Sequence, residues 1–557
     1  MIIDRRLVLG AAAAMAAAGQ AHAATRSVGG GRAHNAALRA LEAYATQHCA
    51  DWGLPGLAIC VVDRDGYAGF VRTGLADVDK RTPVSDDHLF QVGSITKMMT
   101  GLAAHSLMGE GKLSPDARLV DLLPDLPISG AEAVTVQHLL NHTSGIPTDP
   151  PLFPEGGLWS GYAPGSHWSY CNTGYDLLGK IIAAADGRAL PDVLEARVLR
   201  PLGMNASTGA IRNADRARHA IGYEAAFRDR AQLRPGPMAQ APWIESDNAA
   251  GCVSSTTADM ALFLGYLLRL AGGDGGPVLT EAMAHRFMTD TADAPGWSPG
   301  ARYGNGVAHV AIDERRYLTH TGGMVSFSSA LHVDPDAGVA AFASSNVSAY
   351  LNYRPRDVTL FACALLRALR EGSPAPSPRP ARATIANPQI YARRYTAADG
   401  GAFELRADGD QLRLLRNGRS SALQSENGRF FASADADFDV TGLVIDVENE
   451  AAVRAWAGEV EYAVNPAAGF KPLAPDALRV CAGRYDNDDK WAGSVPVYAR
   501  DGKLWLFNTE ALTPLGGDVY RLGDEDWSPE RVQFDRPLNG RPQRMLVSGV
   551  PFIRRFS

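Results

Sequence analysis

The hydrophobic pattern changes its period several times along the chain, and each change predicts a different kind of element. Residues 54–78 alternate apolar and polar side chains on either side of Asp65-Gly66, which predicts a β-hairpin turning at that dipeptide. Apolar residues recur with a helical period in 36–49 and again in 94–113, where the helix begins at Ser94. The same reasoning predicts helices at 134–143, 172–187, 256–273 and 355–372 and strands at 303–312, 316–322, 327–335 and 338–346.

This order of elements indicates an α+β fold for residues 34–371. A strand pair, a long run of helices, a run of strands and a final helix can bury their apolar faces as helices packed on a largely antiparallel sheet. A chain of 557 residues is too long for one core. At roughly 150 residues per domain we expect about three to four domains.

A proline-rich stretch separates this region from a different kind of sequence. Residues 372–385 include GSPAPSPRPARA and predict a semi-rigid linker. Beyond it, short alternating strands and turns predict all-β structure, and two similar units lie about 90 residues apart: Ala392-Arg393-Arg394-Tyr395 with DGDQLRLL, and Ala482-Gly483-Arg484-Tyr485 with RDGKLWLF. We therefore expect two small barrel-like units, at 386–474 and 475–557, with one larger β-domain as the alternative.

The N-terminus has the pattern of an export signal. Asp4-Arg5-Arg6 precedes a short, Ala-rich apolar run that ends in Ala21-His22-Ala23, an A-x-A cleavage site. The paired arginines favour the twin-arginine route. We expect residues 1–23 to be a signal peptide and the protein to be periplasmic or secreted. No later stretch has 18 consecutive apolar residues, so no membrane span is expected in the mature chain.

Composition and charge narrow the range of partners and cofactors. The formal net charge is −7 and no run of Lys and Arg occurs, so a nucleic-acid partner is not expected. The histidines have no metal-ligand spacing, and we expect no metal and no cofactor. The cysteines lack C-x-x-C pairs, their disulfide pairing stays open, and most are expected to be buried apolar side chains: Cys49, Cys60, Cys171, Cys252, Cys363 and Cys481. The expected partner is a small molecule or a short peptide; the oligomeric state stays open.

The segment VGSITKMMTG places a nucleophile and a proton carrier together. Ser94 and Lys97 are three residues apart at a helix start, which puts both side chains on one face. The helix N-terminus adds free amide donors and partial positive charge where an oxyanion would form. S-x-x-K alone is a weak signal, but the preceding FQVG and the small, apolar residues that follow make it specific. This pattern indicates acyl transfer at Ser94.

Two later segments supply further candidate residues. In WSYCNTGY, Tyr170 and Asn172 are two apart and would point to one side of an extended segment. We expect cations beside Tyr170 to lower its pKa below about 10 so that it acts as general base and acid, with Asn172 holding Lys97 and a substrate carbonyl. In LTHTGGMVSFSS, His320 would lie on an edge strand facing Ser94. Gly322 and Gly323 would let a substrate approach, and the Gly323 amide would be the second oxyanion donor. His142 is expected to be a buried, hydrogen-bonded loop anchor.

With these residues, the chain resembles the serine β-lactamase and penicillin-binding-protein superfamily, on the class C and D-Ala-D-Ala carboxypeptidase branch. The resemblance covers about residues 36–370 and rests on FQVGSITK, LLNHTSGIP, APGSHWSYCNTGYDLLG and HTGGMVSFSS, in the family's order. It implies an antiparallel sheet flanked by helices beside an all-helical region. It also implies that Ser94 is the acyl nucleophile, Lys97 its proton partner and Tyr170 the base, with Asn172 and His320 lining the site.

Two features depart from the commonest family pattern. Most members have a lysine where this chain has His320, and a histidine with a pKa near 6.5 is mostly neutral at pH 7. The site should therefore bind the carboxylate of a penicillin or of a C-terminal D-Ala less strongly. A His-x-Gly motif followed by two β-units resembles the D-aminopeptidase subgroup. The resemblance thus favours release of N-terminal D-residues from small amides and peptides.

Three alternatives stay open. A β-lactamase-family esterase and a β-lactamase or DD-carboxypeptidase would use the same residues, and a non-catalytic penicillin-binding sensor would keep the fold without turnover. A cell-wall-binding role for the β-units is compatible with each of these, although their tryptophans are expected to belong to the core: Trp456, Trp491, Trp505 and Trp527.

Overall fold

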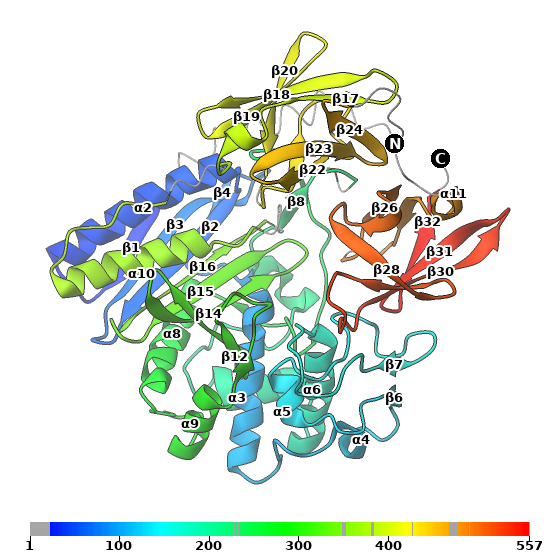
Figure 1. Ribbon diagram of the computed structural model, residues 1–557. Helices are drawn as coiled ribbons and strands as arrows, with labels where there is room; N and C mark the ends of the chain where they lie inside the picture. Colours follow the sequence, from blue (N-terminus) through cyan, green and yellow to red (C-terminus); the bar gives the residue numbers. More distant parts are fainter. Residues whose placement is uncertain are drawn as a thin grey trace. The chain divides into compact units, whose positions relative to one another are not determined.

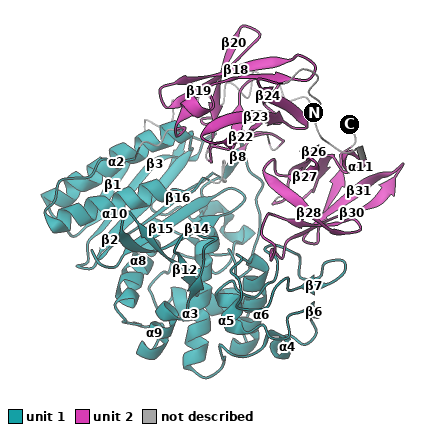
Figure 2. Cartoon of the chain, in the orientation of Figure 1, with its two compact units in different colours: residues 1–224, 237–381 teal, residues 225–236, 382–557 magenta. Residues whose placement is uncertain are grey.

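The computed structural model describes residues 23–555 apart from short gaps at 228, 232, 348–352, 380–383, 426, 467–475 and 490. The predicted signal peptide lies almost entirely outside the described residues. The chain divides into two compact units (Figure 2). Unit 1 contains residues 1–224 and 237–381, and unit 2 contains 225–236 and 382–557. Among the described residues, no helix is long and apolar enough to cross a membrane.

A mainly antiparallel ten-stranded sheet forms the centre of unit 1. Its order is β1 (Ala24–Val28), β3 (Ala68–Asp77), β2 (Gly56–Asp63), β16 (Val339–Ser345), β15 (Ser328–Asp334), β14 (Arg315–Gly323), β13 (Val307–Ile312), β12 (Arg302–Gly304) and β11 (Ala292–Asp293), with β4 (Thr82–Pro83) paired to β3. The predicted hairpin is β2–β3, and the four predicted strands are present as five, because the predicted strand 303–312 is divided into β12 and β13. All residues of β2, β15 and β16 are buried, because helices cover both faces of the sheet.

Three long helices cover this sheet. α2 (Arg32–Trp52) and α10 (Arg356–Glu371) pack against each other and on β3, β15 and β16. α8 (Thr257–Ala271) packs on β2 and β16 without contacting α10, so it covers the opposite face (Figure 1). All three were predicted from the helical period, and their buried stripes explain why: Leu38, Leu41 and Ala45 in α2 face the sheet at helical spacing.

The remaining helices form a separate region beside the sheet (Figure 1). They are α3 (Thr96–Gly109), α4 (Leu119–Leu122), α5 (Val136–Leu140), α6 (Asn172–Asp186), α7 (Leu190–Leu194) and α9 (Glu281–Thr289). α3 lies at the centre, in contact with α6, α7 and α9, and twelve of its fourteen residues are buried. A helix that is apolar around nearly its whole circumference belongs in a core. The expected all-helical region is therefore present, with Lys97 on its central helix and Ser94 on the turn just before it.

The prediction that His320 lies on an edge strand is wrong for the strand as a whole. β14 is an inner strand, because β13, β12 and β11 extend the sheet beyond it. However, β14 pairs with β13 only from Arg315 to Thr319, whereas its pairing with β15 continues to Gly323. Residues 320–323 thus have one free edge. Sequence could not show this, since it depends on where β13 stops.

The described part of unit 2 forms two closed eight-stranded barrels. The strands of the first are β17 (Arg394–Ala397), β18 (Ala402–Asp408), β19 (Gln411–Arg416), β20 (Arg419–Gln424), β21 (Phe430–Ser433), β22 (Leu443–Glu448), β23 (Ala451–Ala457) and β24 (Val460–Val464). Those of the second are β25 (Gly483–Asp486), β26 (Ser494–Arg500), β27 (Lys503–Leu506), β28 (Glu510–Gly516), β29 (Val519–Leu522), β30 (Arg531–Leu538), β31 (Arg541–Val547) and β32 (Val550–Arg554). The fold is two barrels and not one larger β-domain.

The sequence repeat corresponds to a structural repeat. Tyr395 and Tyr485 are both fully buried on the first strand of their barrels. Each hydroxyl donates a 2.9 Å hydrogen bond to the carbonyl four residues earlier, at Tyr391 and Cys481. In each barrel, a buried tyrosine thus holds the turn before the first strand through the same hydrogen bond. Trp456 is buried as expected, but Trp491 is 56% exposed and is not part of the core.

The assignment of residues 225–236 to unit 2 was not predicted from the sequence. This segment connects β8 (Tyr223–Ala225) to β9 (Met238–Gln240), within the part of the sequence that otherwise forms unit 1, yet it belongs to unit 2. The backbone of Arg234 exchanges two hydrogen bonds with the Gln424 side chain of the first barrel, at 2.7 and 2.6 Å. Arg484 of the second barrel donates to the Asp229 carbonyl at 2.7 Å. Residues 225–236, which interrupt the sequence of unit 1, therefore pack with the barrels of unit 2.

Candidate active site

Ser94 stands on a short 3-10 turn that leads directly into the central helix. The turn covers Gly93–Ile95 and α3 starts at Thr96, two residues later than the sequence predicted. Gly93 has a φ of +56°, a conformation that favours glycine. This sharp turn leaves Ser94 partly exposed while its neighbours Gly93 and Ile95 are buried. The geometry presents one hydroxyl at the surface of an otherwise closed core.

Lys97 is completely buried and points its ammonium at Ser94. Its Nζ donates to Ser94 Oγ at 3.1 Å, to Asn172 Oδ1 at 2.6 Å and to the Ala250 carbonyl at 2.9 Å. Burial lowers the pKa of Lys97 to about 7, against the opposing attraction of Asp176 and Asp149. Both protonation states are therefore populated near neutral pH. In the neutral amine, two N–H groups can still donate to Asn172 and Ala250 while the lone pair faces the Ser94 hydroxyl.

Tyr170 completes the group around Ser94, but its pKa shifts in the opposite direction to the one expected. Its hydroxyl is hydrogen-bonded to Ser94, and Lys97 Nζ lies 4.8 Å from the centre of its ring. Burial raises the pKa of Tyr170 well above its usual value, and the Ser94 hydrogen bond and Arg354 offset only part of this rise. The prediction of a lowered pKa is wrong because desolvation outweighs the nearby cations. A phenol that keeps its proton suits a proton donor better than a resting base.

Asn172 links the lysine to a carboxylate that the sequence analysis missed. It begins α6, and while its Oδ1 accepts from Lys97, its Nδ2 donates to Asp149 Oδ1 at 2.8 Å. These two bonds fix the amide orientation. Asp149 is exposed and close enough to influence the pKa of both Lys97 and Tyr170. It follows LLNHTSGIPT and precedes two prolines, and an acid held in so stiff a loop is the signal that could have identified it.

His320 is buried and neutral in this site. Its Nδ1 donates to the Thr321 carbonyl at 2.6 Å, and its Nε2 therefore accepts from the Tyr303 hydroxyl at 2.9 Å. Burial, reinforced by the charge of Lys97, lowers the pKa of His320 to about 3. The expectation of a mostly neutral histidine holds, and by a wide margin. His320 cannot supply the positive charge that a lysine would place here.

Gly322 and Gly323 bring the free edge of β14 against the serine turn. A Cβ on Gly322 would stand 1.9 Å from the Val92 carbonyl oxygen, and a Cβ on Gly93 would stand 2.7 Å from the Gly323 nitrogen. Ser329 adds a hydrogen bond of 2.8 Å to the same Val92 oxygen. Only glycines allow this approach, and it places the Gly323 amide beside the Ser94 turn, as the oxyanion prediction requires.

Arg354 is a cation of the site that the sequence analysis also missed. A Cβ on Gly323 would lie 2.2 Å from one of its guanidinium nitrogens, and its charge influences the pKa of Tyr170. The side chain is half-buried, and its pKa, lowered mainly by burial to about 10, still leaves it charged at pH 7. It lies in YRPRD just before α10, where its proximity to the site depends on the tertiary fold alone.

His142 has the structural role predicted for it. It is fully buried with a φ of +59°, and its Nδ1 accepts a hydrogen bond of 3.0 Å from the Cys171 amide. Its ring centre lies 4.3 Å from that of Tyr170. Because burial and the charges of Lys97 and His320 hold its pKa well below 6.5, it is a neutral support for the Tyr170 ring. All six cysteines are buried, and none is paired with another.

Comparison with known proteins identifies relatives of this chain. Residues 41–365 match the family model described as Beta-lactamase. Penicillin-binding protein 4 of Amycolatopsis lactamdurans is 30% identical over 317 residues, which cover 53% of this chain and 81% of the relative. Penicillin-binding protein 4* of Bacillus subtilis is 25% identical over 418 residues, 67% of this chain and 85% of the relative.

A solved structure shows the same fold over a longer part of the chain. The octameric penicillin-binding protein homologue from Pyrococcus abyssi superposes with a TM-score of 0.55 and covers 76% of this chain and 99% of its own. Sequence identity is 22%. At that level the similarity concerns the fold.

Proposed function

The chain belongs to the beta-lactamase family and is a serine hydrolase of that family, and from this premise we propose that it releases N-terminal D-residues from small amides and peptides. The observation that supports catalysis is the hydrogen bond between Lys97 Nζ and Ser94 Oγ, made by an amine whose pKa is about 7. A lysine that is half neutral at physiological pH can accept the serine proton.

The proposed reaction has two steps. Ser94 Oγ attacks the substrate carbonyl and loses its proton to Lys97, while the Ser94 and Gly323 amides hold the oxyanion. The C–N bond then breaks, and Tyr170 gives its proton to the departing amine and recovers one from Lys97. Water next attacks the acyl-enzyme carbonyl, gives a proton to the same pair and releases the acid and free Ser94 Oγ–H. No group besides substrate and water is needed for this balance.

The substrate class follows from the charges around Ser94. An N-terminal residue carries an ammonium two bonds from the reacting carbonyl, and Asp149 is an exposed carboxylate fixed by Asn172 next to Lys97 and Tyr170. His320 is neutral and engaged by Tyr303 and Thr321, so it offers no charge to a substrate carboxylate. Preference for a D-residue is proposed from the His-x-Gly motif combined with two barrels.

A second candidate function is supported by Arg354. This guanidinium beside Gly323 could hold a substrate carboxylate in place of the missing lysine. The enzyme would then act on penicillins or on peptides ending in D-Ala-D-Ala, in keeping with the names of the relatives from Amycolatopsis lactamdurans and Bacillus subtilis.

One panel separates these candidates. D-Ala p-nitroanilide, its L-isomer, a short-chain ester and a penicillin are each offered to the wild type and to Ser94→Ala, with product release and intact mass followed together. We expect product release from the D-anilide only. Release should be absent in Ser94→Ala, and the KM for the D-anilide should be at least tenfold higher in Asp149→Asn. Penicillin turnover abolished by Arg354→Gln would favour the second candidate, and turnover of the ester alone would make the protein an esterase.

The place of action is part of the proposal. We propose export through residues 1–23, of which residues 1–22 lie outside the described residues. Expression of the full chain followed by N-terminal sequencing of the periplasmic fraction should give Ala24 as the first residue. An intact Met1 in the cytoplasm would contradict it.

A further inference from the structure

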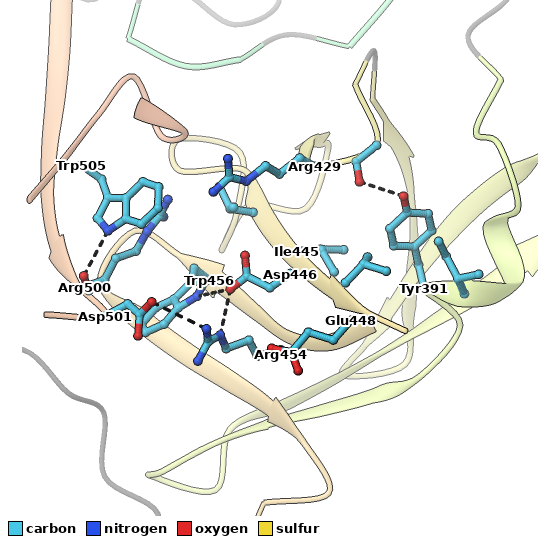
Figure 3. A pocket seen from close by; sticks show the side chains of 14 residues that line it. Tyr391, Arg429, Ile445, Asp446, Glu448, Arg454, Trp456, Arg500, Asp501 and Trp505 are labelled. Carbon is cyan, nitrogen blue, oxygen red and sulfur yellow. Dashed lines mark hydrogen bonds and ion pairs between the residues drawn. The ribbon is translucent and has the colours of Figure 1, made fainter. Parts of the chain in front are cut away.

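Unit 2 contains a pocket of about 520 Å³ that none of the proposed catalytic residues reaches. It lies between the first barrel, which contributes β22, β23 and the residues just before β21, and the β26–β27 turn of the second barrel (Figure 3). Its lining includes Tyr391, Arg429, Asp446, Trp456, Arg500 and Trp505. A volume in the range of about 300–1,000 Å³ with aromatic walls and a few polar groups is typical of small-molecule sites.

Guanidinium groups and indole rings alternate across this pocket. Arg429 and Arg500 both face the ring of Trp505, at 5.4 and 4.8 Å from its centre. Arg500 and Arg454 face the ring of Trp456 in the same way, at 5.9 and 5.8 Å. The order Arg429, Trp505, Arg500, Trp456, Arg454 runs from the first barrel to the second and back to the first. Cation–π contacts of this kind hold the walls in place and leave the pocket positively charged at its Arg429 end.

The arginines at the other end and in the middle already have partners. Arg454 pairs with Asp446 at 2.8 Å and with Asp501 at 3.6 Å, and Trp456 Nε1 donates to the same Asp446 at 3.1 Å. Arg500 is 2% exposed and donates to the carbonyls of Gly458 and Asn508. These contacts fix both groups, so neither is available to turn toward a ligand.

Arg429 differs from both because its guanidinium has neither a hydrogen-bond partner nor an ion-pair partner among the described residues. It is half-buried and projects into the pocket above the Trp505 ring (Figure 3). Its charge is also one of the causes that lower the pKa of Arg500 to about 10, so the two cations repel each other. A negative charge bound at Arg429 would relieve this repulsion and use its free donors.

We propose that this pocket binds a short peptide through its terminal carboxylate, which Arg429 binds while the peptide lies along the pocket wall that contains Trp505. In the described lining only the Arg429 guanidinium has no hydrogen-bond or ion-pair partner, which suits a single carboxylate. A doubly charged phosphate would face Asp446, Glu448 and Asp501 of that lining without a second free cation. The same acids can accept hydrogen bonds from peptide N–H groups. This site is independent of the chemistry at Ser94.

The test measures binding by the full-length chain carrying Ser94→Ala, so that no turnover interferes. Calorimetric titration uses N-acetyl-D-alanyl-D-alanine, its C-terminal amide and inorganic phosphate. We expect the acid to bind, the amide to bind at least tenfold more weakly, and phosphate not to compete. Arg429→Gln should weaken binding of the acid at least tenfold, whereas Arg419→Gln, an exposed arginine of the same barrel outside the pocket, should not.

Further variants separate charge from fold. Arg429→Lys keeps the charge without the two-pronged geometry and should retain part of the affinity, and the thermal midpoint of each variant should match that of its parent. Binding of the acid that is equal in Arg429→Gln and its parent belongs to the catalytic cleft and would overturn the proposal. So would an Arg429-dependent site that prefers phosphate to the peptide, or no binding of the acid at all.

Discussion

At the scale of single residues, the protonation of Lys97 decides when Ser94 can react. The amine must be neutral to accept the serine proton, and burial lowers its pKa to about 7. We therefore predict that kcat/KM for D-Ala p-nitroanilide rises from pH 5 with a midpoint near 7 and falls again above about pH 8, where the α-amino group of the substrate loses the charge that Asp149 binds. Below that midpoint the protonated amine cannot act as base, so activity falls about tenfold per pH unit. A profile that stays flat from pH 5 to 8 would contradict the assignment.

A matched variant tests whether that midpoint belongs to Lys97. Lys97→Arg keeps the positive charge but introduces a group that cannot release a proton near neutral pH, since a guanidinium has a pKa above about 12. We expect kcat/KM to fall by about 10²- to 10⁴-fold, the usual contribution of a positioned base, and the midpoint near pH 7 to disappear. Unchanged thermal stability, measured by circular dichroism, would show that the loss is catalytic.

The raised pKa of Tyr170 leads to a different prediction. If the phenol donates its proton to the leaving amine, Tyr170→Phe should lower kcat on the anilide by about 10²- to 10⁴-fold. A reactive ester, whose leaving group needs little protonation, should lose much less. The midpoint near pH 7 should remain in the variant, because it arises from Lys97. Loss of that midpoint in Tyr170→Phe would instead assign the titration to the tyrosine or to the coupled pair.

At the scale of elements, the contact between the serine turn and the end of β14 determines the shape of the site. In Gly322→Ala the new methyl group would stand 1.9 Å from the Val92 oxygen and 2.3 Å from Ser329 Oγ, both in buried surroundings. We predict a loss of about 1–3 kcal/mol of folding free energy, as for other overpacked sites. The value of kcat/KM should also fall, even at temperatures where the variant is fully folded, because the Gly323 amide moves with the strand.

Gly265→Ala is the control for this substitution. Gly265 lies inside α8, and a Cβ there would meet no atom within 4 Å. Alanine is the better helix former by about 0.5–1 kcal/mol, so this variant should be equally or more stable and fully active. Thermal unfolding and kcat/KM are measured for both. Equal behaviour of the two variants would mean that β14 tolerates a side chain at this contact.

How far sequence predicts such elements depends on whether the information is local. The hairpin β2–β3, the helices α2, α3 and α8 and the repeat of Tyr395 and Tyr485 could be recognised because periodicity and turn residues carry them. The free edge at His320–Gly323 could not, since it arises where β13 stops pairing. The same holds for side chains brought in from afar. Arg354 reaches Gly323 only through the tertiary fold, and the pKa of Tyr170 depends on burial that no motif reports.

At the scale of the whole molecule, the borrowed segment 225–236 couples the two units through the chain itself. A single cut in the linker after residue 371 would separate the barrels from most of unit 1, but 225–236 would lose its partners. Those partners include Asp439, which forms an ion pair of 2.6 Å with Arg230, and the Gln424 side chain, which accepts from the Arg234 amide and donates to the Arg234 carbonyl. The units are therefore not independent modules in sequence.

Limited proteolysis can measure this dependence. Gln424→Ala removes both hydrogen bonds to Arg234, at about 1 kcal/mol each, so opening of the segment should become about 5- to 30-fold more frequent. Cleavage within 225–236 should accelerate by that factor, while Ser420→Ala, an exposed residue of the same barrel, should leave it unchanged. In a truncated chain that ends at residue 381, cleavage within 225–236 should be faster still, because every contact with the barrels is absent. If instead Gln424→Ala and the truncated chain are both cut within 225–236 at the wild-type rate, contacts with the barrels do not protect the segment. Removing the barrels by one cut would then leave the segment unaffected.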